Sequence, residues 1–202
     1  MSALNSAFLN TGIAIRVSRN CAVDKPLHIE WSVSGQSKDM AVHPRVVIFL
    51  EENSELNLVE HFASSFEGAY PNNMVSEISL ERGARFEHTR LQEESYSAYH
   101  LAQIYVDQKR DSTYRSHLFN FGSSIGRTAI HVRLLEPGAF CYLGGLYMIC
   151  EKQHADVYTK VEHVAPHCQS DEVYKGILAG SATSVFNGYV LVQKEAQKTD
   201  SS

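Results

Sequence analysis

The chain has 202 residues, which is enough for one domain with a continuous core and short for two. Its net charge of −5 argues against nucleic acid as a partner, because a surface of that sign repels the phosphate backbone. No apolar run approaches the roughly 20 residues that cross a bilayer, and the first residues lack a basic and apolar secretion signal, so the sequence predicts a cytoplasmic chain without membrane contact.

From residue 46 onward the chain is a succession of short β-like segments with almost no helical periodicity. Residues 46–50 form an apolar, β-branched run. In the next segment Leu56, Leu58 and Phe62 fall on one face, and the residues between them fall on the other. The alternation recurs in later segments, at 130–134 and 157–161, and an apolar run at 189–192 closes the series. This pattern predicts an all-β protein.

A turn followed by a small residue recurs between these segments. The turn residues Asn53, Gly83, Asp111 and Gly138 each precede a small residue, and successive small residues are 30, 28 and 27 positions apart. Such a period, with two or more strands in each repeat, is typical of a β-solenoid whose coils stack on one another. An antiparallel sandwich with evenly spaced hairpins would give the same spacing, so the residues alone leave both architectures open.

The densest group of potential soft-metal ligands is His163, His167 and Cys168. Imidazole nitrogen and thiolate sulfur suit zinc or iron. Pro166 argues against a helix that would place both histidines on one face, and a structural turn with hydrogen-bonded histidines explains the same residues. A metal bound here would make the protein a metal-dependent β-solenoid enzyme, which we keep as the alternative function.

The remaining histidines are scattered along the chain. His88, His100, His117 and His131 lie on separate β-like segments, and stacked coils could align them as a ladder. Stacked polar residues in solenoids are mostly structural, although a ladder of histidines could also bind a metal.

Other residues give weaker signals. The Gly144 and Gly145 pair is typical of a tight coil corner. The cysteines, at 21, 141, 150 and 168, match no common zinc spacing and are expected to be free thiols. No nucleophile elbow, phosphate loop or zinc-protease motif is present, so we expect no catalysis by this chain alone.

Short blocks near the end of the chain carry a family resemblance. They lie at 163–170, 175–178, 185–188 and 196–200, and they include the motifs Pro-His-Cys-x-Ser and Ala-Gln-Lys-Thr-Asp. In this order and at these gaps they resemble the core domain of the SufB/SufD family, and its SufD branch in particular. That family belongs to the Suf machinery, which assembles iron–sulfur clusters. Earlier blocks extend the resemblance through nearly the whole chain.

The resemblance implies a fold and a role. Residues 1–202 would form a single domain of the family's core type, a right-handed parallel β-helix. The protein would be a structural component of an assembly platform rather than an enzyme, with a SufB-like protein and a SufC-like ABC ATPase as partners. A homodimer is a further expectation. The iron–sulfur cluster and a flavin would belong to the intact complex, and we expect no cofactor on this chain.

The sequence departs from the family pattern at both ends. The family's Cys-x-His-Gly segment and its SufC-docking helices follow the Ala-Gln-Lys-Thr-Asp block, and a helical region often precedes the core. Residues 1–202 contain none of these segments, so we expect them to be a C-terminally truncated piece of the core.

Overall fold

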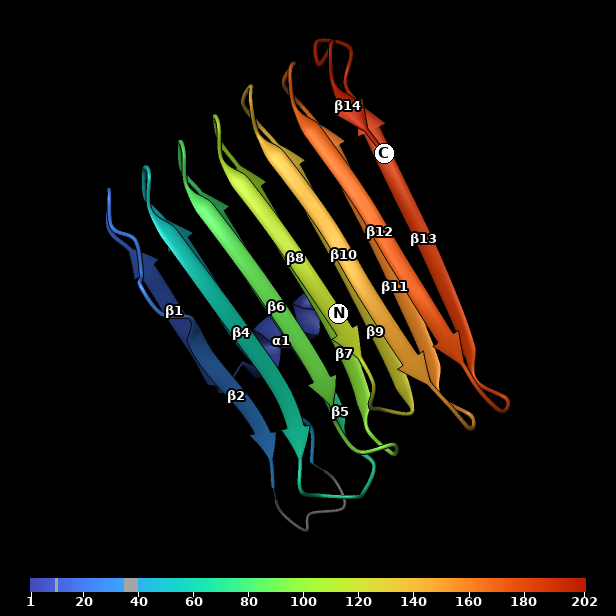
Figure 1. Cartoon of the computed structure of the whole chain (residues 1–202). Coiled ribbons are helices and arrows are strands. Elements are labelled where there is room, and N and C mark those ends of the chain that lie inside the picture. Colours follow the sequence, from blue (N-terminus) through green and yellow to red (C-terminus); the bar gives the residue numbers. More distant parts are fainter. Residues whose placement is uncertain (10, 35–39) are drawn as a thin grey trace.

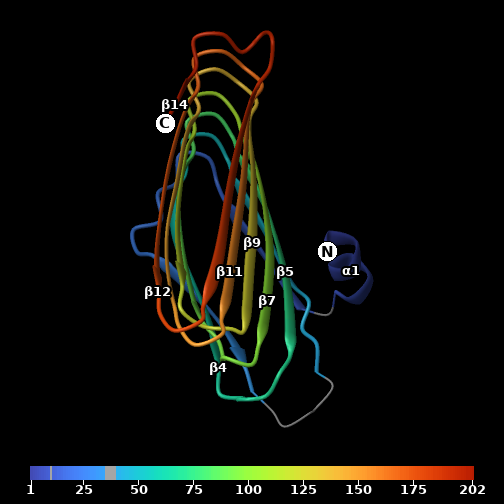
Figure 2. The ribbon, with the colours of Figure 1, turned by 90° about the vertical axis from the view of Figure 1, so that its right-hand side faces the viewer.

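The chain winds into stacked coils, and its strands pair in parallel with strands of the neighbouring coils (Figure 1). The computed structural model describes residues 1–9, 11–34 and 40–202. After one short helix, α1 (Ser2–Phe8), the strands alternate between two seven-stranded sheets. The sheets face each other as the long sides of a flattened coil (Figure 2). The β-solenoid prediction is therefore confirmed, and the antiparallel sandwich is wrong.

Each sheet takes every second strand of the chain. The odd sheet contains, in spatial order, β1 (Thr11–Val17), β3 (Pro44–Leu50), β5 (Pro71–Leu80), β7 (Tyr99–Gln108), β9 (Ile125–Leu134), β11 (His154–His163) and β13 (Thr183–Val192). The even sheet contains β2 (Leu27–Val33), β4 (Glu55–Ser64), β6 (Arg85–Glu93), β8 (Thr113–Asn120), β10 (Phe140–Ile149), β12 (Gln169–Leu178) and β14 (Asp200–Ser201).

One corner of successive coils carries a residue with positive φ. These corner residues are Asn20, Asn53, Gly83, Asp111, Gly138, His167 and Lys198. Backbone hydrogen bonds join one corner to the next, as from Asn53 N to Arg82 O and from Gly83 N to Arg110 O, each at 2.9 Å. Asn, Asp and Gly tolerate this left-handed conformation better than other residues. The period that the sequence predicted is the spacing of these corners.

Glycine meets two requirements at this corner. Gly138 has a φ of +79°, and a Cβ atom there would overlap the Asp111 carboxylate of the preceding coil. Gly83 has a φ of +67°, and its Cβ would overlap the Asn53 side chain in the same way. Both positions therefore favour a residue without a side chain.

At the five corners from Asn53 to His167, the following residue is small and buried, so that the corner can turn into the even sheet without a gap. These residues are Ser54, Ala84, Ser112, Ala139 and Cys168, each at most 1% exposed. The seryl hydroxyls also close the turn, since Ser54 Oγ donates to Glu51 O and Ser112 Oγ to Lys109 O, both at 2.7 Å.

The core fills the space between the two sheets. Leu56, Leu58 and Phe62 of β4 are at most 1% exposed, which confirms the face that their alternation predicted. Burying one such side chain contributes about 1.5–3 kcal/mol. At the far end of the stack the inward-facing residues of β13 are uncovered, and Phe186 and Val190 are 44% and 40% exposed.

Helix α1 packs outside the coils, against the odd sheet (Figure 2). The side-chain amide of the fully buried Asn5 donates to Pro44 O at 2.8 Å and to Asn73 O at 2.7 Å, which ties the helix to two strands. Across the described ranges, no helix has the length and apolarity needed to cross a bilayer.

Candidate functional site

The three residues predicted as metal ligands lie around the coil corner between β11 and β12. His163 is fully buried at the end of β11, with Nε2 3.0 Å from Ser170 Oγ. Its Nδ1 has no hydrogen-bond partner among the described residues. Cys168 is buried, and its Sγ lies 3.3 Å from Glu136 O. His167 is exposed and is the positive-φ residue of this corner.

The repeat supplies a structural explanation for two of these residues. His167 takes the place that Gly138 has one coil earlier, and Cys168 takes that of Ala139. Burial lowers the pKa of His163 and raises that of Cys168, so both favour their neutral forms. Within 1–9, 11–34 and 40–202, no three His, Cys, Asp or Glu side chains form a group that could hold a metal. The metal assignment stays a prediction.

Two other interpretations of the sequence are wrong. The four histidines form no ladder, because His88 and His100 point into the coil from opposite sheets, whereas His117 and His131 lie on outer faces. Gly144 and Gly145 lie within strand β10 rather than at a corner. A side chain at Gly144 would overlap the ring of Tyr142, so the glycine is needed for close packing within the sheet.

The interior of the solenoid contains a buried carboxylate, Glu60, with a hydrogen-bond donor at each of its two oxygens. Trp31 Nε1 donates to Glu60 Oε1 at 2.9 Å, and His88 Nε2 lies 2.7 Å from Glu60 Oε2. The other ring nitrogen of His88 lies 3.3 Å from the Tyr114 hydroxyl. A neutral His88 that donates to Glu60 and accepts from Tyr114 satisfies all these contacts. Strands β2, β4, β6 and β8 each supply one residue.

The electrostatics of this network keep Glu60 charged. Burial alone would raise its pKa, but the Arg90 charge and the His88 and Trp31 hydrogen bonds outweigh burial and lower the pKa to about 2. For His88, burial is the largest effect and lowers the pKa, against the opposing hydrogen bond to Glu60. Neutral imidazole beside a carboxylate is therefore the favoured state at neutral pH.

A second buried carboxylate, Glu94, lies in the corner region between β6 and β7. His100 Nδ1 lies 2.6 Å from Glu94 Oε2, and Asn72 Nδ2 and the Tyr70 hydroxyl donate to Oε1 at 2.9 and 3.1 Å. Burial would raise the pKa of Glu94, but His100 and the hydrogen bonds lower it to about 2. This network joins the β5, β6 and β7 coils from within.

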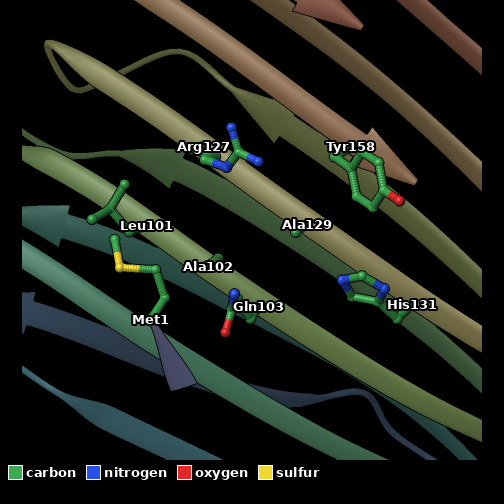
Figure 3. Close-up of a pocket in the computed structure, with 8 residues that line it drawn as sticks. All are labelled: Met1, Leu101, Ala102, Gln103, Arg127, Ala129, His131 and Tyr158. Atoms are coloured by element: carbon green, nitrogen blue, oxygen red, sulfur yellow. The ribbon is translucent and has the colours of Figure 1, made fainter. Parts of the chain in front are cut away.

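The outer face of the odd sheet bears a shallow groove of about 200 Å³ beside the chain's first residue (Figure 3). Its lining comprises Met1, Leu101, Ala102, Gln103, Arg127, Ala129, His131 and Tyr158. Arg127 is paired with Asp156, Gln103 accepts a hydrogen bond from Ser2, and the ring of His131 lies 5.5 Å from that of Tyr158. The groove therefore presents mainly aromatic and apolar groups, beside an arginine whose charge is paired.

Another hollow, also of about 200 Å³, lies at the start of the coil stack. Its lining includes Trp31, Val33, His43 and Asn72. Trp31 connects this hollow to the interior, because its indole N–H reaches Glu60.

Sequence reasoning missed the buried charged residues. Glu60 lies between Leu58 and Phe62 on the face that was correctly predicted to point inward, so strict alternation alone indicated a buried carboxylate. Arg90 follows the inward-facing Phe86 and His88 in the same way. This signal was not recognised, because charged side chains are usually exposed to solvent.

These features define a class of protein, a parallel β-solenoid with two broad sheets and a polar stretch within its core. The family follows from comparison with known proteins. A family model described as "SUF system FeS cluster assembly, SufBD core domain" matches residues 33–202. The chain belongs to this SufBD core family.

Several curated proteins are similar to nearly the whole chain. "Protein ABCI7, chloroplastic" of Arabidopsis thaliana is 31% identical over 196 residues, which are 93% of this chain and 41% of that protein. "Iron-sulfur cluster assembly protein SufD" of Escherichia coli is 29% identical over 189 residues, 92% of this chain and 44% of that protein. The chain thus spans less than half the length of these relatives.

Proposed function

We propose that the chain is the β-helical core of a SufD-like component of the iron–sulfur cluster assembly platform, acting in the cytoplasm with a SufB-like protein and a SufC-like ATPase. The match of the SufBD core model to residues 33–202 carries this proposal. The core serves as a structural platform rather than as an enzyme. The iron–sulfur cluster is cargo of the complex, and a flavin would likewise bind to the complex.

Co-purification tests the proposal. The tagged gene product is expressed together with SufB-like and SufC-like proteins of the same organism, and the eluate is analysed by mass spectrometry. We expect both proteins in fixed ratio with the tagged chain. Elution of the chain without either protein would contradict the proposal.

The second candidate is a metal-dependent enzyme with His163, His167 and Cys168 as ligands. The unpaired Nδ1 of the buried His163 is the observation in its favour. Metal content after purification distinguishes the two candidates, because the platform proposal needs no metal at this corner.

A further inference from the structure

Helix α1 presents apolar side chains to solvent and polar side chains to the protein. Ser2, Asn5 and Ser6 make hydrogen bonds to the odd sheet, and Asn5 is fully buried. Leu4 and Phe8 are four residues apart and therefore share one face of the helix, where they are 46% and 60% exposed. A surface helix of a globular protein normally has the reverse arrangement, with its apolar face toward the core.

This apolar helix face continues onto the sheet beneath it. Val47 of β3 is 41% exposed and lies two residues from Arg45, which donates to Ser6 Oγ at 2.9 Å. Tyr105 of β7 is 36% exposed, and its hydroxyl lies 2.9 Å from Ser2 Oγ. The surface that we call the α1 face consists of Leu4, Phe8, Val47 and Tyr105. Helix α1 stands on the outer side of the coils, and no described element covers it there (Figure 2).

The α1 face runs into the groove beside the chain's first residue. The rings of Tyr105 and His131 are stacked with centroids 5.2 Å apart, and His131 lines that groove together with Tyr158 of β11. Adjacent strands lie about 4.8 Å apart, so the combined surface is about 19 Å wide from β3 to β11. This width is at the small end of the range for specific interfaces, so the association that it supports is weak.

Three arginines that border this surface are paired within the same chain. The ion pairs are Arg45–Glu77, Arg127–Asp156 and Arg133–Asp107. Helix α1 contains no charged side chain. A two-fold axis brings a surface against its own copy, so an unpaired charge near the axis would meet a like charge. A surface whose charges are already paired avoids this repulsion, and it offers no free charge to select a different protein.

We propose that the α1 face is the interface of a symmetric dimer of this chain, in which α1 packs antiparallel against α1 of the second copy. Leu4 lies near the middle of the helix, so an axis at this position places Leu4 against its own copy. Phe8 then lies toward the first turn of the other helix, where Met1 is 50% exposed and offers a thioether to the aromatic ring. The even sheets of both copies stay outside the dimer.

Opposite charges at position 4 test the axis. Leu4→Glu and Leu4→Lys are purified separately, and sedimentation velocity is measured from about 10 µM to 1 mM, where small interfaces dissociate. We expect the wild type to approach the mass of two chains as its concentration rises. Each variant should keep the mass of one chain, because like charges meet at the axis, and an equimolar mixture of the two should regain the mass of two chains.

Ile177→Glu is the matched control, because Ile177 is 55% exposed on the outer face of the even sheet, and it should dimerise like the wild type. A wild type that stays monomeric at 1 mM would overturn the proposal, and so would a mixture of the two charged variants that stays monomeric. If the charged variants fail to fold, Leu4→Ala keeps a good helix former and should weaken dimerisation about tenfold or more. An unchanged dimer in Leu4→Ala would place the contact elsewhere and refute the α1 face. The purified chain is used alone, so the result is independent of the co-purification described above.

Discussion

At the scale of single residues, the buried charges of this solenoid are neutralised across coils rather than within one strand. Glu60 on β4 is held by donors from β2 and β6. Glu94, which His100 contacts within its own coil, also accepts a hydrogen bond from Asn72 on β5, one coil earlier. A buried carboxylate that loses its donors is strongly destabilising. These contacts therefore join consecutive coils in a way that the apolar core alone does not.

His88 should make stability depend on pH. Its folded pKa lies below the ordinary 6.5, so the unfolded chain binds this proton more readily than the folded chain. The contribution is fully present above pH 6.5 and is lost as the pH falls toward the folded pKa. We expect the free energy of unfolding to fall between pH 7.5 and 5.5, with at most about 1.4 kcal/mol per pH unit from this residue.

Urea unfolding at several pH values measures this slope. His88→Gln keeps a donor for Glu60 and should reduce the slope, whereas His28→Gln, at an exposed position, should leave it unchanged. An equal slope in wild type and His88→Gln would show that His88 is not the group that titrates.

Gly138 should tolerate asparagine better than alanine. Either side chain forces the Asp111 carboxylate aside, but a left-handed φ costs alanine about 1–2 kcal/mol, and asparagine less. An asparagine amide could also donate to Asp111, as Asn53 Nδ2 does to Asn20 Oδ1 at 3.1 Å. Thermal or urea unfolding of the two variants gives the difference. Equal stabilities would mean that the clash, rather than φ, governs this corner.

Single residues also show where sequence reasoning ends. The inward face of β4 followed from the period-two alternation of Leu56, Leu58 and Phe62. That Arg90 reaches Glu60 depends on the register between β4 and β6, which pairs residues 30 positions apart. Register of this kind arises from the whole coil, so the sequence predicted an inward face but not its ion pair.

At the scale of the element, the repeating corner accounts for most of the turns that were predicted from the sequence. Gly83 and Gly138 were recognised because glycine before a small residue is a strong turn signal. The equivalence of His167 to Gly138 was not predicted, because it becomes visible only when the coils are stacked. Gly144 and Gly145 were wrongly predicted to form a coil corner. In the structure they make room for tyrosine rings within a strand, and the sequence alone does not distinguish such glycines from glycines at a turn.

The Cys168→Ala variant distinguishes a structural role of Cys168 at the corner from a role as a metal ligand. The equivalent positions already carry Ala84 and Ala139, so we expect a loss of about 1 kcal/mol in stability, as for removal of one methyl group from a core. Cys168→Leu should cost about 1–3 kcal/mol, because the corner has no room for it. Elemental analysis of wild type and Cys168→Ala accompanies the unfolding curves. Zinc near one per chain that disappears in Cys168→Ala would favour the metal-dependent enzyme.

At the scale of the whole molecule, each coil contacts mainly its two neighbours, as in other repeat proteins. The protection of backbone amides should therefore be greatest in β5 to β11 and should decrease toward both ends. Hydrogen exchange read by mass spectrometry measures this gradient.

The stacked corners have a consequence for the length of the molecule. Adjacent strands of a sheet lie about 4.8 Å apart, so each added coil extends the solenoid by that increment. Insertion of one complete repeat, from one positive-φ corner to the next, would keep every corner hydrogen bond and both sheet registers. Proteins of this architecture can therefore change the distance between surfaces at their two ends in fixed steps, without redesign of the core.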